Sequence, residues 1–159
     1  MTTQDRIKLL QSMPFFGAVK DSSIALLLDL STTLSLQPGE YFFRQGDQGD
    51  SLYILEQGAI SIFKQSGEDE LELREVNEGS CFGDLALIDL TPRSASVRAK
   101  TPCTAIKIPA SALHKLYQYD CEQYLIIQMN IARELSRRLR ASDERWFQLQ
   151  TLTHQDSST

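Results

Sequence analysis

The chain has 159 residues, of which 42% are hydrophobic, and it carries a net charge of −5 with a pI near 5.0. A chain of this size can bury one sizeable core, so a single domain over 1–159 is expected. Its acidic surface repels a phosphate backbone, and it lacks an apolar run of about 20 residues and the charged-then-apolar start of a secretion signal. We therefore expect a cytoplasmic protein that binds neither nucleic acid nor membrane directly.

Two short helices are predicted at the N-terminus. Residues 3–13 carry apolar side chains at helical spacing, and Pro14 cannot continue a helix. The cluster Asp21–Ser23 can cap a second helix, in which Ile24 and Leu27 are apolar. Each helix thus has one apolar face that can pack on the rest of the chain.

Between residues 32 and 109 the pattern changes to short β-rich runs separated by turn signals such as Pro38-Gly39 and Gly46-Asp47. The predicted strands are 32–36, 40–44, 51–56, 59–65, 71–76, 95–99 and 104–108. Short strands at this spacing are typical of a closed double-sheet arrangement. The expected fold is therefore mainly β with flanking helices, and its centre is a double-stranded β-helix or jelly-roll barrel at about 32–109.

After Pro109 the pattern is helical again, with a short helix near 111–119, a long helix over about 121–150 and a polar tail, 151–159, that is expected to be disordered. The long helix places apolar residues at a and d positions of one heptad frame, which predicts a dimer seam. The seam comprises Leu125, Ala132, Leu135, Leu139, Trp146 and Leu149, with Gln128 and Ser142 as polar members. Off the seam, three residues are expected to pack on the barrel: Ile126, Ile127 and Ile131. The alternative is a single helix that only covers the barrel.

The most informative segment, residues 82–97, reads FGDLALIDLTPRSASV. Gly83 and Ala86 are small enough for backbone N–H groups at the start of a short helix to approach an anion closely. Arg93, ten residues after Gly83, offers a planar fork of donors that matches two phosphate oxygens. Asp84 suits a ribose hydroxyl. This pattern predicts a sugar-phosphate site, and the alternative is a structural ion pair between Asp84 and Arg93.

Together with the ordered glycines of the strand region, this segment resembles the cyclic nucleotide-binding domain family. The resemblance is to the sensor domain of the catabolite activator protein and of protein kinase A regulatory subunits, and it covers residues 14–146. The matching positions outside the segment are Pro38–Glu40, Arg44–Asp47, Gly49–Ile54, Gly58 and Gly79. The ligand that the resemblance implies is a 3′,5′-cyclic nucleotide, with cAMP favoured over cGMP, and no further cofactor is expected.

The resemblance also implies a role for each residue of the segment. Arg93 and Ser94 bind the cyclic phosphate, and Asp84 binds the ribose 2′-hydroxyl. The turn that completes the phosphate site comprises Gly83, Leu85 and Ala86, the last two through their amides. The family usually has Glu where this chain has Asp84, which is one methylene shorter, so the ribose contact is expected to be longer or bridged by water.

The base contacts are less specific. Ile62, Leu73 and Val76 match positions that line the purine pocket in the family, although apolar residues on strands are core residues first. In the family the long helix reaches over the nucleotide, which places Ser142 and Asp143 near the base. The Asp143 carboxylate can accept a hydrogen bond from a purine amino group, or it is simply solvated.

Catalysis and metal binding are not expected, because the chain has only two histidines, His114 and His154, and lacks a nucleophile motif and a Walker loop. The cysteines lack Cys-x-x-Cys spacing and are expected to be reduced thiols: Cys81, Cys103 and Cys121.

The remaining question is the output of the domain. Too little chain follows the long helix for a helix-turn-helix module, so the expected function is a stand-alone cyclic nucleotide sensor that acts in trans on an unknown effector protein. The alternative is a degenerate module that keeps the fold and the dimer helix but binds no nucleotide.

Overall fold

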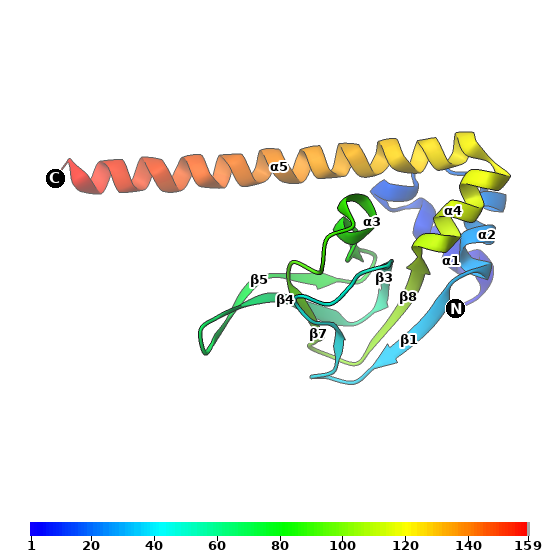
Figure 1. Cartoon of the computed structure of the whole chain (residues 1–159), viewed down its shortest axis with the longest axis horizontal. Helices are drawn as coiled ribbons and strands as arrows, with labels where there is room; N and C mark the ends of the chain where they lie inside the picture. Colours follow the sequence, from blue (N-terminus) through cyan, green and yellow to red (C-terminus); the bar gives the residue numbers. More distant parts are fainter. Residues whose placement is uncertain (159) are drawn as a thin grey trace.

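The structure is a computed structural model that describes residues 1–158, apart from the side chain of Ala86. Two four-stranded antiparallel sheets form its centre, one in the order β1-β8-β3-β6 and the other in the order β2-β7-β4-β5 (Figure 1). The strands are β1 Thr32–Leu36, β2 Tyr41–Phe43, β3 Ser51–Gln57, β4 Ala59–Ser66, β5 Asp69–Asn77, β6 Cys81–Phe82, β7 Ser96–Ala99 and β8 Cys103–Pro109. The predicted mainly β, jelly-roll fold with flanking helices is confirmed.

Most of the helices gather at one end of the barrel, and the long C-terminal helix runs from that end along the barrel and past it (Figure 1). Their bounds are α1 Thr3–Gln11, the 3-10 helix η1 Pro14–Phe16, α2 Asp21–Asp29, α3 Leu85–Asp89, α4 Ala110–Tyr119 and α5 Cys121–Ser157. A capping box starts α1: the Asp5 N–H donates to the Thr2 hydroxyl at 3.1 Å, and the Thr2 N–H donates to the Asp5 carboxylate at 3.0 Å. In α2 the N-cap is Lys20 rather than a residue of the expected cluster, because the helix already begins at Asp21.

Strand β3 separates two apolar cores. Because successive side chains of a strand point to opposite faces, Leu52 and Ile54 pack with the helices, whereas Tyr53 and Leu55 pack inside the barrel. The strand is therefore buried on both faces, which explains why its sequence is a continuous apolar run rather than an alternating one.

The first half of α5 is fixed to the body of the molecule. Ile127 and Ile131 are buried in the core that the helices share, as predicted, and Ile126 and Leu135 pack against its edge. The Asn130 side-chain amide donates hydrogen bonds to two carbonyl oxygens at the end of η1, at 3.1 and 2.9 Å. Leu135, expected on the dimer seam, is thus partly used by the chain's own core.

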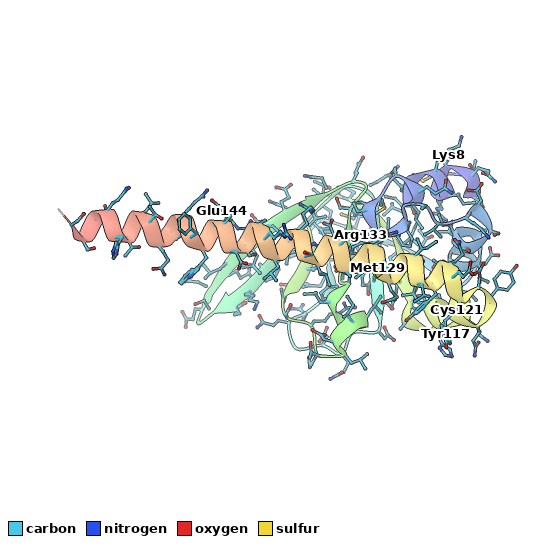
Figure 2. All side chains as sticks on the ribbon, turned by 90° about the horizontal axis from the view of Figure 1, so that it is seen from above. Lys8, Tyr117, Cys121, Met129, Arg133 and Glu144 are labelled. Atoms are coloured by element: carbon cyan, nitrogen blue, oxygen red, sulfur yellow. The ribbon has the colours of Figure 1, made fainter. Side chains whose placement is uncertain are left out.

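The second half of α5 projects past the barrel (Figures 1 and 2). It carries large apolar side chains that are 58–65% exposed: Leu139, Trp146, Phe147, Leu149 and Leu152. The helix continues through Ser157 instead of ending near Gln150, because 151–157 contains no glycine or proline to stop it; Thr159 lies outside the described residues. None of the helices that the structure describes is long and apolar enough to cross a membrane.

Candidate functional site

A cavity lies between the segment that follows β6 and the inner face of the β2-β7-β4-β5 sheet. Residues 83–95 supply much of its lining, so the segment singled out in the sequence does form one wall of a cavity. The rest of the lining comes from β2, β4, β5, β7 and α5, through Phe43, Ile62, Arg74, Val97 and Arg138. Ser94 is exposed and also lines the cavity.

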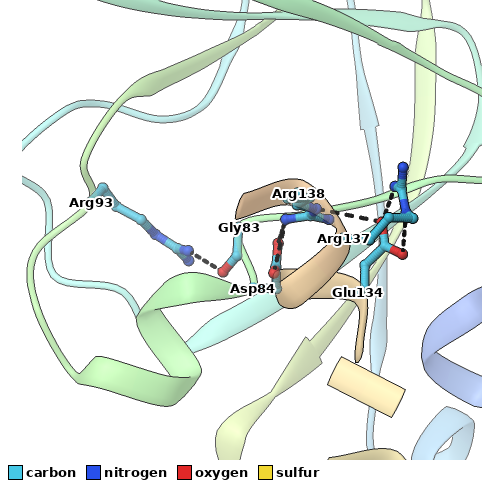
Figure 3. Close-up of polar contacts among 6 residues, drawn as sticks. All are labelled: Gly83, Asp84, Arg93, Glu134, Arg137 and Arg138. Carbon is cyan, nitrogen blue, oxygen red and sulfur yellow. Dashed lines mark hydrogen bonds and ion pairs between the residues drawn. The ribbon is translucent and has the colours of Figure 1, made fainter. Parts of the chain in front are cut away.

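Arg93 is the buried cation of this cavity, with 6% of its surface exposed. Its Nη1 donates to the Gly83 carbonyl at 2.6 Å (Figure 3). Its Nη2 donates to the Ser51 carbonyl at 2.8 Å, and its guanidinium lies 4.0 Å from the centre of the Phe43 ring. Its Nε is buried and has no hydrogen-bond partner among the described residues. Burial lowers the pKa of Arg93. A buried cation that neutral carbonyls hold in place, with its Nε still unpartnered, is suited to receive an anion.

Gly83 makes this arrangement possible. Its φ is +74°, and a Cβ at this position would lie 2.9 Å from the Arg93 Nη1 and 3.2 Å from the Phe43 ring. Both the left-handed backbone and the close approach therefore require glycine. Leu85 and Ala86 follow in the first turn of α3, where backbone N–H groups have no partner within the helix.

Asp84 belongs to a polar network that reaches α5. Its carboxylate is buried, and its two oxygens lie 3.2 and 3.4 Å from Nη1 of Arg138 (Figure 3). The Nε of Arg138 lies 3.5 Å from Glu134, which also pairs with Arg137. The alternative of an ion pair between Asp84 and Arg93 is therefore wrong, because each of the two side chains has other partners.

The expected base contacts are divided. Ile62 lines the cavity, but the other four residues lie outside its lining. Val76 is buried in the barrel core and borders a neighbouring cavity, and Leu73 is 57% exposed. Ser142 and Asp143 are exposed on the projecting half of α5.

Two arginines of the lining were missed by the sequence analysis. Arg74 lies directly opposite Ile62 in the pairing of β5 with β4. It is two residues from the buried Val76, so strand alternation already placed it on the inner face. No local sequence pattern indicates that Arg138 lines the cavity, because its partner Asp84 is 54 residues away in sequence.

The arrangement combines three kinds of chemistry in one cavity. Arg93 can bind an anion, the Asp84 carboxylate can accept hydrogen bonds from hydroxyl groups, and Ile62 and Val97 offer an apolar surface for a flat group. No cluster of His, Cys, Asp or Glu suited to a metal ion occurs among the described residues. The site can thus hold an organic phosphate that has both hydroxyl groups and an apolar part.

A sequence model of one protein family, described as the cyclic nucleotide-binding domain, matches residues 33–120. The cAMP-dependent protein kinase regulatory subunit of Emericella nidulans is 35% identical over 107 residues, which are 67% of this chain and 26% of that protein. The Drosophila melanogaster type II regulatory subunit is 35% identical over 92 residues, 58% of this chain and 24% of that protein. The chain thus spans about a quarter of the length of these curated relatives.

Solved structures of this kind have the same fold. The catabolite activator protein of Thermus thermophilus matches with a TM-score of 0.75 and 27% identity, over 86% of this chain and 62% of that one. The regulatory domain of Toxoplasma gondii PKA, crystallised with cAMP, matches with a TM-score of 0.71 and 25% identity, over 85% of this chain and 50% of that one. Both likenesses extend over most of the chain, well beyond the segment that the family model matches.

Proposed function

Because the chain belongs to the cyclic nucleotide-binding domain family, we propose that its cavity binds a 3′,5′-cyclic nucleotide and that the protein is a regulatory sensor without catalytic activity. The observation that carries this proposal is Arg93. Its guanidinium lies at the wall of a cavity, where it is buried and held by two neutral carbonyls while its Nε has no partner among the described residues. A negatively charged phosphate offsets the cost of burying this charge.

With the phosphate bound at Arg93, the positions of the other groups of the ligand can be assigned. The phosphate lies at Arg93, with Ser94 and the amides of Leu85 and Ala86 as further donors. The ribose 2′-hydroxyl lies at Asp84, and the base lies over Ile62. A hydroxyl that donates to Asp84 competes with Arg138 for the same carboxylate, because Nη1 of Arg138 already lies 3.2 and 3.4 Å from its two oxygens.

This competition offers a route from the ligand to α5. When the ribose binds Asp84, the ion pair that ties Arg138 to the cavity weakens, and the packing of the helix shifts with it. We propose that α5 forms a homodimer through the seam and delivers the signal in trans to an unidentified effector protein. The exposed Leu139, Trp146 and Leu149 support this role, because large apolar side chains along one helix are suited to bind a second helix.

Calorimetric titration with cAMP and with cGMP tests the proposal. The unmodified chain should bind one nucleotide per cavity, with cAMP expected to bind more tightly on the family resemblance alone. Arg93→Leu should weaken binding by about 2–5 kcal/mol, because it removes a buried charge partner of the phosphate. Arg98→Leu is the matched control: this arginine lies in β7, five residues after Arg93, but it pairs with Glu70 and lines a different cavity.

Thermal unfolding of both variants shows whether the barrel remains intact. If neither nucleotide produces a heat of binding when it is titrated into the folded, unmodified chain, the proposal is contradicted. That result would favour a degenerate module that dimerises without a ligand. Equal losses in Arg93→Leu and Arg98→Leu would show that the binding site lies elsewhere.

A further inference from the structure

A second cavity, with a volume of about 370 Å³, borders the one that the proposed function uses. It lies among η1, the end of β5, the turn into β6 and the first half of α5. Among the described residues, the two cavities have only Arg74 and Arg138 in common. The second cavity is in the size range of small-molecule sites, so it can hold a ligand of its own.

This second cavity has an excess of positive charge, although the chain as a whole carries −5. Three arginines line it: Arg74, Arg137 and Arg138. Two glutamates line it as well, but the carboxylate of Glu75 pairs with Lys100 at 3.3 Å, and Lys100 is not part of the lining. Glu75 alternates with Val76 along β5, so its side chain leaves the strand on the opposite face. Glu134 is therefore the one carboxylate among the described lining that pairs with the arginines.

One carboxylate does not satisfy three guanidinium groups. Glu134 pairs with Arg137 and lies 3.5 Å from the Nε of Arg138, whose Nη1 is turned to Asp84 (Figure 3). The Arg137 side chain is 69% exposed, so most of it is accessible from solvent. Arg74 has no hydrogen bond or ion pair within the part of the chain that the structure describes. Each guanidinium has five N–H donors, so many donors remain for an anion.

The rest of the lining is partly apolar. Met13 and Phe15 of the η1 region and Val76 of β5 are buried side chains that border the cavity. The Arg138 guanidinium lies 5.8 Å from the centre of the Phe15 ring, so charged and apolar groups are close together. A ligand that combines an anionic group with a small apolar part matches this surface.

We infer that the second cavity binds a small organic anion, a phosphate ester or a carboxylate with a short apolar group, and that it does so separately from the cyclic nucleotide. A guanidinium fork matches two oxygens of either anion, which is the shared chemistry of the two ligand classes. Several arginines around one cavity favour the phosphate ester, because it carries up to two negative charges. The inference goes beyond the proposed function and does not depend on it.

Calorimetric titration with three probes tests the anion requirement, in a buffer without phosphate or carboxylate. Phenyl phosphate and benzoate carry the two anionic groups on the same ring, and benzyl alcohol is their neutral counterpart. We expect both anions to bind the unmodified chain with dissociation constants of about 1 mM or tighter, phenyl phosphate more tightly than benzoate. Benzyl alcohol should give no measurable binding.

Substitutions of opposite effect locate the site on α5. Arg137→Gln removes a donor that lines only the second cavity, so it should weaken phenyl phosphate binding about tenfold. Glu134→Gln removes the carboxylate that competes with the ligand for Arg137, so it should tighten binding about twofold to fivefold. A folding defect cannot produce this second result. Arg133→Gln is the matched control, because Arg133 is an exposed arginine of the same helix that lines neither cavity.

Arg93→Leu shows which cavity holds the probe. Arg93 lines only the nucleotide cavity, so the variant should bind phenyl phosphate as tightly as the unmodified chain does. If the variant loses the probe, phenyl phosphate occupies the nucleotide cavity, and the inference is overturned.

Three further results also overturn the inference: no binding of either anion, binding of benzyl alcohol as tight as that of the anions, and equal losses in Arg137→Gln and Arg133→Gln. Weaker binding in Glu134→Gln contradicts it too, because the carboxylate would then support the ligand rather than compete with it. A chain that binds phenyl phosphate in this pattern but neither cAMP nor cGMP refutes the proposed function alone. The two failures are therefore distinguishable.

Discussion

The two halves of α5 have opposite surroundings, although they form one continuous helix. The first half buries Ile127 and Ile131 in the core of its own chain and brings Arg138 to the cavity. The second half projects past the barrel (Figure 2), and its Trp146 and Leu149 side chains are exposed. The first half of the helix is therefore part of the fold and of the candidate site, whereas the second half leaves large apolar side chains uncovered by the described chain.

The two halves of α5 should differ most in how much an alanine substitution lowers the free energy of unfolding. Ile131→Ala should lower the free energy of unfolding by about 2–5 kcal/mol, because it leaves a cavity among side chains that cannot fully collapse. Leu149→Ala, the control in the projecting half, should cost less than about 0.5 kcal/mol at a concentration where the chain is monomeric. Denaturant unfolding measures both. Similar losses at the two positions would contradict the division of the helix.

A charge in the dimer seam should weaken the dimer and leave the stability of the monomer nearly unchanged. Leu139→Asp places carboxylates opposite each other in a dimer, so it should raise the dimer dissociation constant at least a hundredfold, roughly 3 kcal/mol, and leave the unfolding of the monomer nearly unchanged. Sedimentation velocity gives the dissociation constant. If the variant remains as dimeric as the parent, the seam is not the contact surface.

Arg138 lies where the two halves meet, and its loss should have an intermediate effect. Arg138→Gln leaves the buried Asp84 carboxylate without its charged partner, which should cost about 1–3 kcal/mol of stability. Combining it with Asp84→Asn should recover much of that loss, because the uncompensated charge is then removed. Arg140→Gln, on the exposed side of the helix, is the matched control. No recovery in the double variant would mean that the ion pair is not what stabilises this region.

The labelling rates of two cysteines test whether the first half of α5 stays docked on the barrel, and they do so without a substitution. Cys81 lies beneath the first half of α5, beside a cavity that Glu134, Arg137 and Arg138 also line, and burial raises the pKa of its thiol. Cys121 is exposed at the start of α5. A thiol reagent near pH 8 should therefore label Cys121 within minutes and the partly exposed Cys81 much more slowly, because less of Cys81 is present as the reactive thiolate. Equal labelling rates would show that this half of α5 does not stay docked.

The sequence predicted most of the barrel, because its strands are set by local patterns. Turn residues and β-branched runs placed β1 at its observed bounds and the longer strands within about three residues. Strand β6 was missed, since two residues carry no periodicity and their pairing with β3 is long-range. The helical end of the chain was missed too, because its polar composition suggested disorder although nothing in it breaks a helix.

The site was predicted where one short segment makes it, and less well where distant elements meet. The segment around Gly83, Asp84 and Arg93 is local, so its residue types and spacing were readable. Leu73 was expected at the base pocket, but it is the extra residue of a β-bulge opposite Ile62 and Phe63, and the neighbouring Arg74 takes the inner position. Alternation from the buried Val76 already points to Arg74 rather than Leu73, so the expectation for Leu73 came from the family resemblance and not from the strand pattern.

The most direct test of the account is whether the nucleotide and the helix are coupled. Sedimentation velocity should give the dimer dissociation constant of the unmodified chain without ligand and with cGMP or cAMP at a concentration that calorimetry shows to saturate the site. Because ribose binding at Asp84 competes with Arg138, the account predicts that the constant changes by about fivefold or more, as coupling energies of 1–3 kcal/mol imply. An identical constant at saturation would contradict it.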